Sequence, residues 1–236
     1  MLSRRLKYKL FKKAYAIFGR NSFSQAGEDM VIDFLLQTIK RPVPSYLELG
    51  VYDPRNGSNT YKFYIRGAKG VLVEADGSLI ENIKDQRPND KVLHLGVGLD
   101  EKPEAVFYVF DEPSISTFDK EEAQYRQAQG LYKIVREDKV PMKPINRIIA
   151  EDCNGLPDIL SIDIEGLDYE VLLSWDAEKF PIPIIITETC TYSQNHIKGK
   201  DERILPMMLD KGYFMYADTY INTIFVHKDW FQNIGT

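Results

Sequence analysis

At 236 residues, the chain is long enough for one well-buried domain and short for two. Apolar residues make up 44% of it and aromatic residues 12%, which predicts a globular core and excludes a disordered chain. The net charge is −5, but the first 20 residues hold seven of the 30 basic residues and no acid, so the remainder is strongly acidic. This balance argues against a protein that follows nucleic-acid backbones, and we expect no nucleic-acid partner.

The cysteines and the apolar runs bear on the cellular compartment. Cys153 and Cys190 are far apart in the sequence and show no metal or redox spacing, which favours a reducing environment. No run of about 18 apolar residues occurs, and lysines interrupt any apolar core that a secretory signal would need in the first 20 residues. We therefore expect a cytoplasmic protein.

A basic amphipathic helix is expected over residues 1–22, ahead of the main domain. Leu2, Leu6 and Leu10 recur every four residues among lysines and arginines. Two interpretations stay open. The helix lies on anionic lipid through residues 1–20, at the inner face of a membrane, or it packs on the domain or on a second subunit, as in a homodimer.

From residue 23 to residue 236, helical and strand patterns alternate, which predicts a single α/β domain. Strands are expected at 46–50, 70–76, 91–97, 158–164, 182–189, 212–218 and 222–228, and helices at 27–39, 58–66, 78–85, 144–151, 167–175 and 201–211. No helix separates the last two strands, so they should form an antiparallel hairpin at one edge of the sheet. The predicted fold is a seven-stranded, mostly parallel sheet with helices on both faces, a Rossmann-like arrangement. Residues 104–142 interrupt the alternation, and their length marks them as a candidate lid or acceptor-binding wall.

Acidic residues lie where the expected strands end, at the edge where open parallel sheets bind ligands. A carboxylate in the position of Glu74 suits the two hydroxyls of a ribose, although a solvated strand-end acid is the simpler alternative. The loop that begins at Gly50 lacks the G-x-G-x-x-G pattern, which argues against a dinucleotide and against a nicotinamide dehydrogenase. Glu48, just before this loop, would repel phosphate and suits a cationic ligand such as S-adenosylmethionine.

Six motifs, in order along nearly the whole chain after residue 22, resemble those of the FkbM-type methyltransferases, which are Rossmann-like class I enzymes. The motifs are SFSQAGEDMVI, YLELGVYDPRNGSNTYKFY, GVLVEADGSLI, STFDKEEAQ, ILSIDIEGLDYEVL and NTIFVHK. The resemblance implies S-adenosylmethionine as the cofactor and methyl transfer to a hydroxyl of a sugar or a natural product. Val51 and Tyr52 depart from the small residue and the Asn that are usual in the first loop. Together with the strand ends, the motifs lead us to expect cofactor contacts from Gln25, Glu48, Gly50, Tyr52, Ser58, Glu74, Ala75, Val97 and Asp163.

An alcohol is a poor nucleophile, so its methylation needs a group that removes the hydroxyl proton. His196, in the expected loop 191–200, is a candidate general base held by the strand-end acid Glu188. Alternatively, Asp163, Glu165 and Glu188 hold Mg²⁺, which would acidify the hydroxyl, since Asp163 and Glu188 should end adjacent strands. Simpler roles also stay open: Asp163 accepts hydrogen bonds from the methionyl ammonium, and Glu188 caps a loop.

The function indicated by these observations is S-adenosylmethionine-dependent O-methylation of a sugar hydroxyl, in a surface polysaccharide or its precursor. Two alternatives stay open. One is the O-methylation of a natural-product hydroxyl, and the other is a methyltransferase-like binding or scaffold protein without catalysis, for which the unusual Val51 and Tyr52 are the argument.

Overall fold

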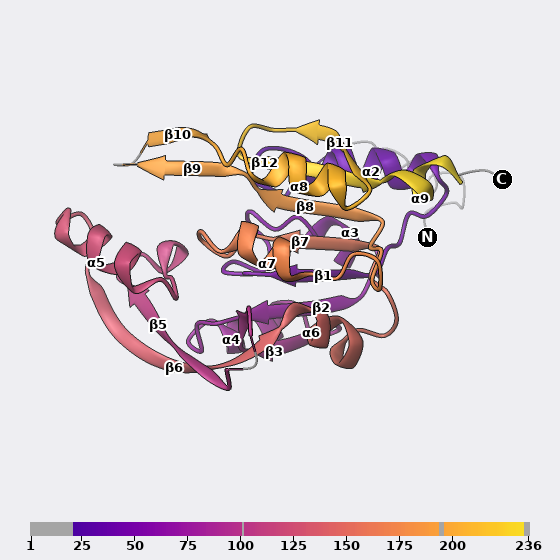
Figure 1. Cartoon of the computed structure of the whole chain (residues 1–236). Helices are drawn as coiled ribbons and strands as arrows, with labels where there is room; N and C mark the ends of the chain where they lie inside the picture. Colours follow the sequence, from indigo (N-terminus) through magenta and orange to yellow (C-terminus); the bar gives the residue numbers. More distant parts are fainter. Residues whose placement is uncertain (1–20, 101, 194–195, 234–236) are drawn as a thin grey trace, which may run out of the picture.

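A seven-stranded sheet forms the centre of the molecule (Figure 1). The computed structural model describes residues 21–100, 102–193 and 196–233, with the backbone alone for 191–193 and 196–198. In spatial order the strands are β11 (Tyr213–Asp218), β12 (Asn222–His227), β8 (Ile184–Glu188), β7 (Ile159–Ile162), β1 (Tyr46–Leu49), β2 (Gly70–Glu74) and β3 (Lys91–His94). The strands from β3 to β8 pair in parallel, whereas β12 is antiparallel to both β8 and β11. The predicted sheet with its terminal hairpin is confirmed.

The strand order reverses between β1 and β7. From β1 the chain continues outward through β2 to β3, and it later returns to β7 on the other side of β1 and continues to β8. The connections therefore leave β1 and β7 in opposite directions at the C-terminal ends of these two strands. A reversal of this kind is where open parallel sheets bind their ligands.

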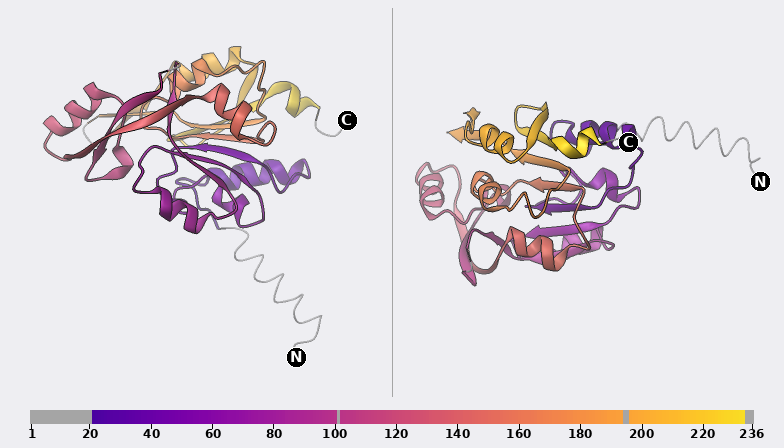
Figure 2. Two further views of the ribbon diagram at one scale, coloured as in Figure 1. Left: turned by 90° about the horizontal axis from the view of Figure 1, so that it is seen from below. Right: turned by 45° about the vertical axis from the view of Figure 1, so that its right-hand side comes forward.

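Two apolar cores cover the two faces of the sheet, with helices on both sides (Figure 2). The first face packs under α2 (Glu28–Thr38), α3 (Tyr61–Tyr64) and α4 (Ile80–Gln86), and the second under α6 (Ile145–Asp152), α7 (Asp168–Ser174) and α8 (Ile204–Asp210). Side chains alternate between the faces, so Tyr46 lies in the first core and Leu47 in the second. The same alternation turns Glu48, Glu74 and Ser161 toward the first face, near the ends of their strands. This row of polar groups is the floor of the site described below.

The helix expected at 58–66 is shortened to the single turn of α3. Ser58 Oγ accepts hydrogen bonds from the amides of Thr60 and Tyr61, at 3.2 and 3.1 Å, and donates to a carboxylate oxygen of Glu48 at 3.0 Å. Residues 58–60 are therefore fixed as a cap above the sheet, and the helix begins only at Tyr61. The N-terminal part of that prediction was wrong, because a buried side chain competes with the first helical turn.

The strand expected at 91–97 is divided. Residues 91–94 form β3 in the main sheet, and β4 (Gly96–Gly98) pairs with β6 (Ile134–Pro144) in a separate sheet. A Cβ on Gly96 would lie 2.4 Å from the ring of Phe118 and 2.6 Å from the sulfur of Met142, so a larger residue would have to displace these two side chains. The chain leaves the main sheet here because another set of side chains occupies the space beside Gly96.

Residues 104–144, here called the arm, are the largest addition to the sheet. They form β5 (Glu104–Phe110), the short 3₁₀ helix η1 (Pro113–Ile115), α5 (Lys120–Ala128) and β6. β6 pairs with both β5 and β4, which gives a three-stranded sheet of its own. The arm extends beyond the end of the main sheet at which β1 and β2 finish (Figure 1).

A second projection lies at the same end. The segment expected as a loop around His196 is instead an antiparallel pair of β9 (Cys190–Ser193) and β10 (His196–Lys200). Lys200 Nζ donates to Thr189 Oγ1 at 2.7 Å and to Asp218 at 2.9 Å, which fixes the returning strand at its base. The loop prediction was wrong because this tertiary anchor cannot be read from the segment itself.

The remaining predictions concern membrane-spanning helices and the basic helix expected at residues 1–22. Within the described ranges, no helix is both long and apolar enough to cross a bilayer. The basic helix expected at 1–22 lies, up to residue 20, outside the described residues, and its role stays a prediction. β12 is followed by α9 (Lys228–Gln232), whose Trp230 packs against the core on the first face of the sheet.

Candidate active site

A pocket of about 350 Å³ opens at the C-terminal ends of β1, β2 and β7, where the strand order reverses. Its size is within the range of small-molecule sites. The main sheet, the loop after β1 and the arm all contribute to its lining. All nine residues expected to contact the cofactor line this pocket: Gln25, Glu48, Gly50, Tyr52, Ser58, Glu74, Ala75, Val97 and Asp163.

Gly50 allows β1 and β7 to approach each other at the base of the pocket. Its φ is +78°, and a Cβ at this position would lie 1.8 Å from the carbonyl oxygen of Asp163. Both the backbone angle and the contact exclude any other residue. Its amide donates to the carbonyl of Val73 on the other side, at 3.0 Å, so the turn is fixed between β2 and β7.

The negative charge of Glu48 is already paired, which changes the role expected for it. Arg87 Nη1 lies 3.5 Å from Glu48 Oε2, and both side chains are buried. The hydroxyls of Ser58 and Thr60 donate to the same carboxylate, at 3.0 and 2.5 Å. Glu48 lines the pocket, but it acts mainly as an anchor for residues 58–60, and its charge is balanced by a cation beneath the loop.

Glu74 also supports the loop after β1. Its carboxylate accepts hydrogen bonds from the amides of Val51, Tyr52 and Asp76, at 3.1, 2.9 and 2.8 Å. A carboxylate can accept about four hydrogen bonds, so part of its capacity is left for a ligand. Burial raises the pKa of Glu74, although the three amides oppose the effect. The ribose contact expected of Glu74 stays a prediction, and the backbone contacts are the role that the structure adds.

A neutral amide forms part of the polar end of the pocket. The side chain of Asn59 is buried, and its Nδ2 donates to Ser161 Oγ at 3.0 Å. Its Oδ1 accepts no hydrogen bond from any residue that the structure describes. Asn59 and Ser161 both line the pocket, and neither was singled out from the sequence. A serine at a core position of a buried strand, in ILSIDI, was the available signal.

Three carboxyl groups lie close together just after β7. Asp163 is exposed at the open pocket, and desolvation by the protein around it, together with the charges of Glu48 and Glu28, raises its pKa to about 6. Burial and the neighbouring Asp163 raise the pKa of Glu165 to about 7, and burial with the same neighbour raises that of Asp168 to about 8. Asp163 and Glu165 line the pocket, so its polar end holds acids whose ionisation is costly without a cation.

The loop that carries these acids has an unusual backbone. Glu165 has a φ of +55° and the following Gly166 a φ of +101°. A left-handed conformation is uncommon for a residue with a side chain and occurs often at functional sites. The carboxylate of Glu165 lines the pocket, and Nη1 of Arg126, on the arm, lies 3.5 Å from its Oε2.

The opposite end of the pocket is apolar. Ala75, which follows β2, packs with Phe107 and Phe118 from the arm, and Val97 from β4 also lines the pocket. The two aromatic rings lie 4.7 Å apart between centroids, at an angle of 46°. Phe107 and Phe118 were missed in the sequence, because their contact with the sheet depends on how the arm folds back.

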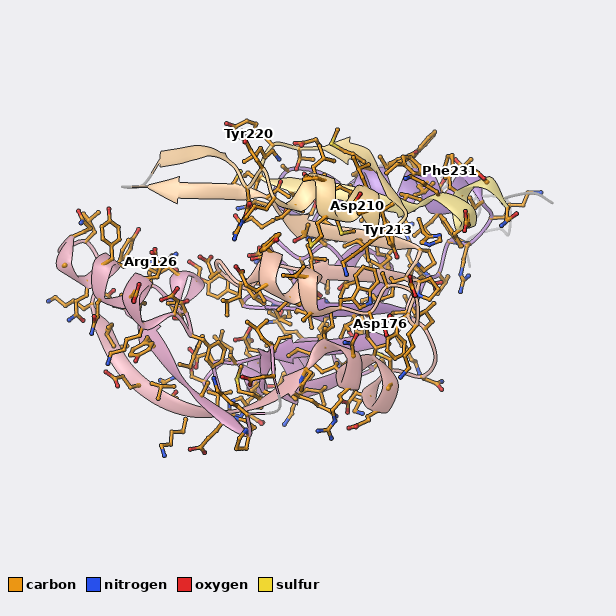
Figure 3. The ribbon with its side chains drawn as sticks, viewed as in Figure 1. Arg126, Asp176, Asp210, Tyr213, Tyr220 and Phe231 are labelled. Carbon is orange, nitrogen blue, oxygen red and sulfur yellow. The ribbon has the colours of Figure 1, made fainter. Side chains whose placement is uncertain are left out.

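Further contacts attach the arm to the rim of the pocket. Arg136 on β6 donates to the buried carboxylate of Asp76 at 2.7 Å, and the hydroxyl of Tyr52 donates to Glu112 at 3.4 Å. Figure 3 shows Arg126 on the arm and Tyr220 above it, near the β9–β10 pair. The arm is therefore bonded to both the loop after β1 and the loop after β2.

The remaining catalytic candidates lie apart from the pocket lining or outside the described side chains. Glu188 ends β8 beside β7, as expected, since Thr187 pairs with Ile162, but it does not line the pocket. The backbone of His196 lies in β10, and its side chain is outside the described part. His196 as the general base therefore stays a prediction.

The expected metal site is not formed by the predicted ligands. Among the described residues, no group of three or more His, Cys, Asp or Glu side chains is placed to hold a metal ion. Asp163 and Glu165 line the pocket, but Glu188 does not, and Glu165 lies beside Arg126. The prediction that Asp163, Glu165 and Glu188 form a three-ligand set was therefore wrong, because adjacent strand ends do not by themselves direct side chains to one point.

Comparison with known proteins gives one family match. The model of the methyltransferase FkbM domain matches residues 48–215. No curated protein matches the chain.

Several solved structures show a weak likeness to the chain. A putative RNA methyltransferase from Pyrococcus horikoshii is 14% identical, with 86% of this chain and 83% of that one covered and a TM-score of 0.42. A TehB-like SAM-dependent methyltransferase from Corynebacterium glutamicum is 11% identical, with 94% and 97% covered and a TM-score of 0.42. Magnesium protoporphyrin IX methyltransferase from Synechocystis, with bound SAM, is 9% identical, with 92% and 90% covered and a TM-score of 0.40.

Proposed function

Because the chain belongs to the FkbM methyltransferase family, we propose that it transfers the methyl group of S-adenosylmethionine to a hydroxyl of a sugar, in a surface polysaccharide or its precursor. The observation that carries the proposal is the difference between the two ends of one pocket. Carboxylates lie at one end and an aromatic pair at the other. A molecule with a cationic amino-acid part and a flat aromatic base is matched by this arrangement.

In S-adenosylmethionine the methyl group is bonded to a sulfonium, so an oxygen nucleophile can attack the methyl carbon in line while the neutral thioether S-adenosylhomocysteine leaves. The protein then has to position the donor, exclude water and accept one proton. Asp163 offers negative charge to the cationic part of the donor, and Phe107 and Phe118 offer apolar surface to its base. Gly50 and the backbone amides fixed by Glu74 shape the wall between them.

The hydroxyl proton needs an acceptor in the pocket, and we assign this role to Glu165. Its carboxylate lines the pocket, and its raised pKa of about 7 suits a group that takes up a proton near neutral pH and releases it afterwards. Arg126 lies beside it and favours the ionised form that can accept the proton. His196, with Glu188 as its partner, is the alternative base.

The sugar part of the proposal is supported by the family and by exposed aromatic rings. Tyr52 lines the pocket with 44% of its surface exposed, and Tyr220, with 53% exposed, lies near the base of the β9–β10 hairpin. Such rings offer an apolar face and a polar hydroxyl, which suits the face of a sugar. The acidic composition argues for a glycan rather than a nucleic acid.

The test is transfer of label from methyl-labelled S-adenosylmethionine to a panel of acceptors. The panel contains sugar nucleotides, lipid-linked and polymeric glycans, phenolic natural products and RNA, with Asp163→Asn as the control that lacks the donor charge. We expect label in a glycan fraction from the unmodified protein alone. Label in natural products or RNA would contradict the glycan assignment, and donor binding without any transfer would favour a non-catalytic binding protein.

A further inference from the structure

The chain enters the domain at a fixed point between α2 and α3. The buried ammonium of Lys62, on α3, donates to the carbonyl oxygen of Asn21 at 2.7 Å. The carboxylate of Asp29, in the first turn of α2, accepts a hydrogen bond from the amide of Phe23 at 2.8 Å. Residues 1–20 are therefore attached beside the outer surface of these two helices.

The outer surface of α2 and α3 exposes large apolar side chains. Phe34 on α2 is 68% exposed, the largest fraction for a large apolar residue in the described part of the chain, and Ile65, directly after α3, is 52% exposed. Arg66 bonds to both carboxylate oxygens of Asp33, which joins the two elements next to these side chains. α2 and α3 also share one face of the sheet (Figure 2). Phe34 and Ile65 therefore lie exposed on one side of the molecule.

The exposed charge on this side is positive, although the domain as a whole is acidic. Residues 34–45 contain two basic residues and no acid, and residues 54–73 contain four basic residues and no acid. Lys40 and Lys69 are exposed and form no ion pair with any carboxylate that the structure describes. The acids of α2 are all buried: Glu28, Asp29 and Asp33.

Phe34, Lys40, Ile65 and Lys69, here called the α2–α3 surface, specify the charge of a partner. Residues 1–20 hold seven basic residues and no acid, so packing them on this surface would bring like charges together. A second copy of the chain that met it with the same surface would do the same. An anionic partner removes both repulsions, because the segment and the surface attract it together.

The exposed apolar side chains distinguish the classes of anionic partner. Phe34 and Ile65 gain free energy by leaving water for an apolar phase, which a membrane offers beneath its headgroups and the phosphate backbone of a nucleic acid does not. The sequence of residues 1–20 has leucines every four residues among its basic residues, the pattern of a helix that lies in a membrane interface. Lysines and arginines near an anionic bilayer add electrostatic attraction. An anionic lipid surface therefore matches both the charge and the apolar groups.

We propose that residues 1–20 and the α2–α3 surface together bind an anionic membrane surface. Phe34 and Ile65 enter the boundary between headgroups and acyl chains, and Lys40 and Lys69 face the headgroups. This inference goes beyond the proposed function and does not depend on it, because it concerns where the protein is held and not what it methylates.

The test is flotation of the full-length chain with lipid vesicles. One set of vesicles is phosphatidylcholine alone, and the other contains phosphatidylglycerol as well. We expect binding to the anionic vesicles only. At about 1 M salt, where the screening length falls to about 3 Å, this binding should become at least about tenfold weaker.

Two double variants test the α2–α3 surface. Phe34→Ser combined with Ile65→Ser should weaken binding to anionic vesicles about tenfold, since it removes two apolar groups from the bilayer boundary. Lys40→Glu combined with Lys69→Glu should weaken binding at least about tenfold at low salt and much less at about 1 M salt, because its effect is electrostatic.

Leu173→Ser combined with Lys179→Glu is the matched control. Leu173 is 55% exposed on α7, which covers the second face of the sheet, and Lys179 is exposed after this helix. This variant makes one change of each kind and should bind vesicles like the unmodified protein. The melting temperature of each variant reports on folding, and we expect changes of no more than about 2 °C, since all the exchanged side chains are exposed.

Four outcomes would overturn the inference. Absence of vesicle binding by the unmodified protein would remove the membrane as the partner, and unchanged binding by Phe34→Ser with Ile65→Ser would remove the α2–α3 surface. Binding to a single-stranded RNA homopolymer that is as tight as vesicle binding, and unaffected by this double variant, would indicate a general polyanion site. If deletion of residues 1–20 converted a dimer into a monomer without loss of vesicle binding, these residues would be a subunit contact.

Discussion

Gly50 is the residue at which the site is most sensitive to a single change. Its positive φ and the 1.8 Å approach of a Cβ to the Asp163 carbonyl oxygen mean that Gly50→Ala must push β1 and β7 apart. We expect this variant to lose at least about 100-fold in S-adenosylhomocysteine affinity by calorimetry, because the shift displaces Asp163 itself.

Gly155→Ala is the matched control. Gly155 also has a positive φ, +85°, but no atom lies within 4 Å of a Cβ there, so we expect about 1 kcal/mol lower stability and unchanged binding. Equal affinity of the two variants would show that Gly50 does not shape the pocket.

At the scale of the element, the arm supplies one wall of the cofactor pocket and not only a cover over it. Phe118 packs on Phe107 and beside Gly96, and it closes the apolar end of the pocket. We expect Phe118→Ala to weaken adenosine, 5′-methylthioadenosine and S-adenosylhomocysteine by a similar factor, about tenfold, because the lost surface meets the part that they share. Phe231→Ala, a partly exposed aromatic residue on α9 (Figure 3), is the control and should leave all three affinities unchanged. If Phe118→Ala weakened the binding of S-adenosylhomocysteine alone, the adenosine part would not bind beside Phe118.

At the scale of the whole molecule, the fold gathers acids from distant parts of the chain around one point. Desolvation by the surrounding protein, together with the charges of Glu48 and Glu28, raises the pKa of Asp163 from an ordinary 3.8 to about 6. Between these values the folded protein binds a proton that the unfolded chain releases, so the contribution of Asp163 to stability falls as the pH rises through this window. We expect Asp163→Asn to raise the melting temperature of the ligand-free protein more at pH 8 than at pH 4.5, as measured by thermal unfolding.

Asp210→Asn is the control for this pH dependence. Asp210 ends α8 at the surface (Figure 3) and does not line the pocket, so its replacement controls for the general effect of exchanging a carboxyl group for an amide. If Asp163→Asn changed the melting temperature equally at both pH values, the pKa of Asp163 would not be raised in the folded protein. The same variant should bind S-adenosylhomocysteine poorly, since the charge that destabilises the empty site is the charge that meets the ligand.

The sequence by itself determined the alternation of strands and helices, the antiparallel end of the sheet and the positions of the strand-end residues. These follow from side-chain periodicity and from turn residues, which are local properties of the chain. For that reason residues such as Gly50 and Asp163, which come directly after buried strands, could be assigned to the ligand edge from the order of the amino acids alone.

Only the tertiary structure decided which of these groups are available to a ligand. Arg87 pairs with Glu48, which it follows by 39 positions, and Ser161 meets Asn59 across 102 positions. Charge compensation and buried hydrogen bonds depend on distances between side chains, and periodicity does not report those distances. The strand ends therefore indicated an acidic edge, while the folded chain showed that Glu48 is already paired with Arg87 and that Asn59 is bonded to Ser161.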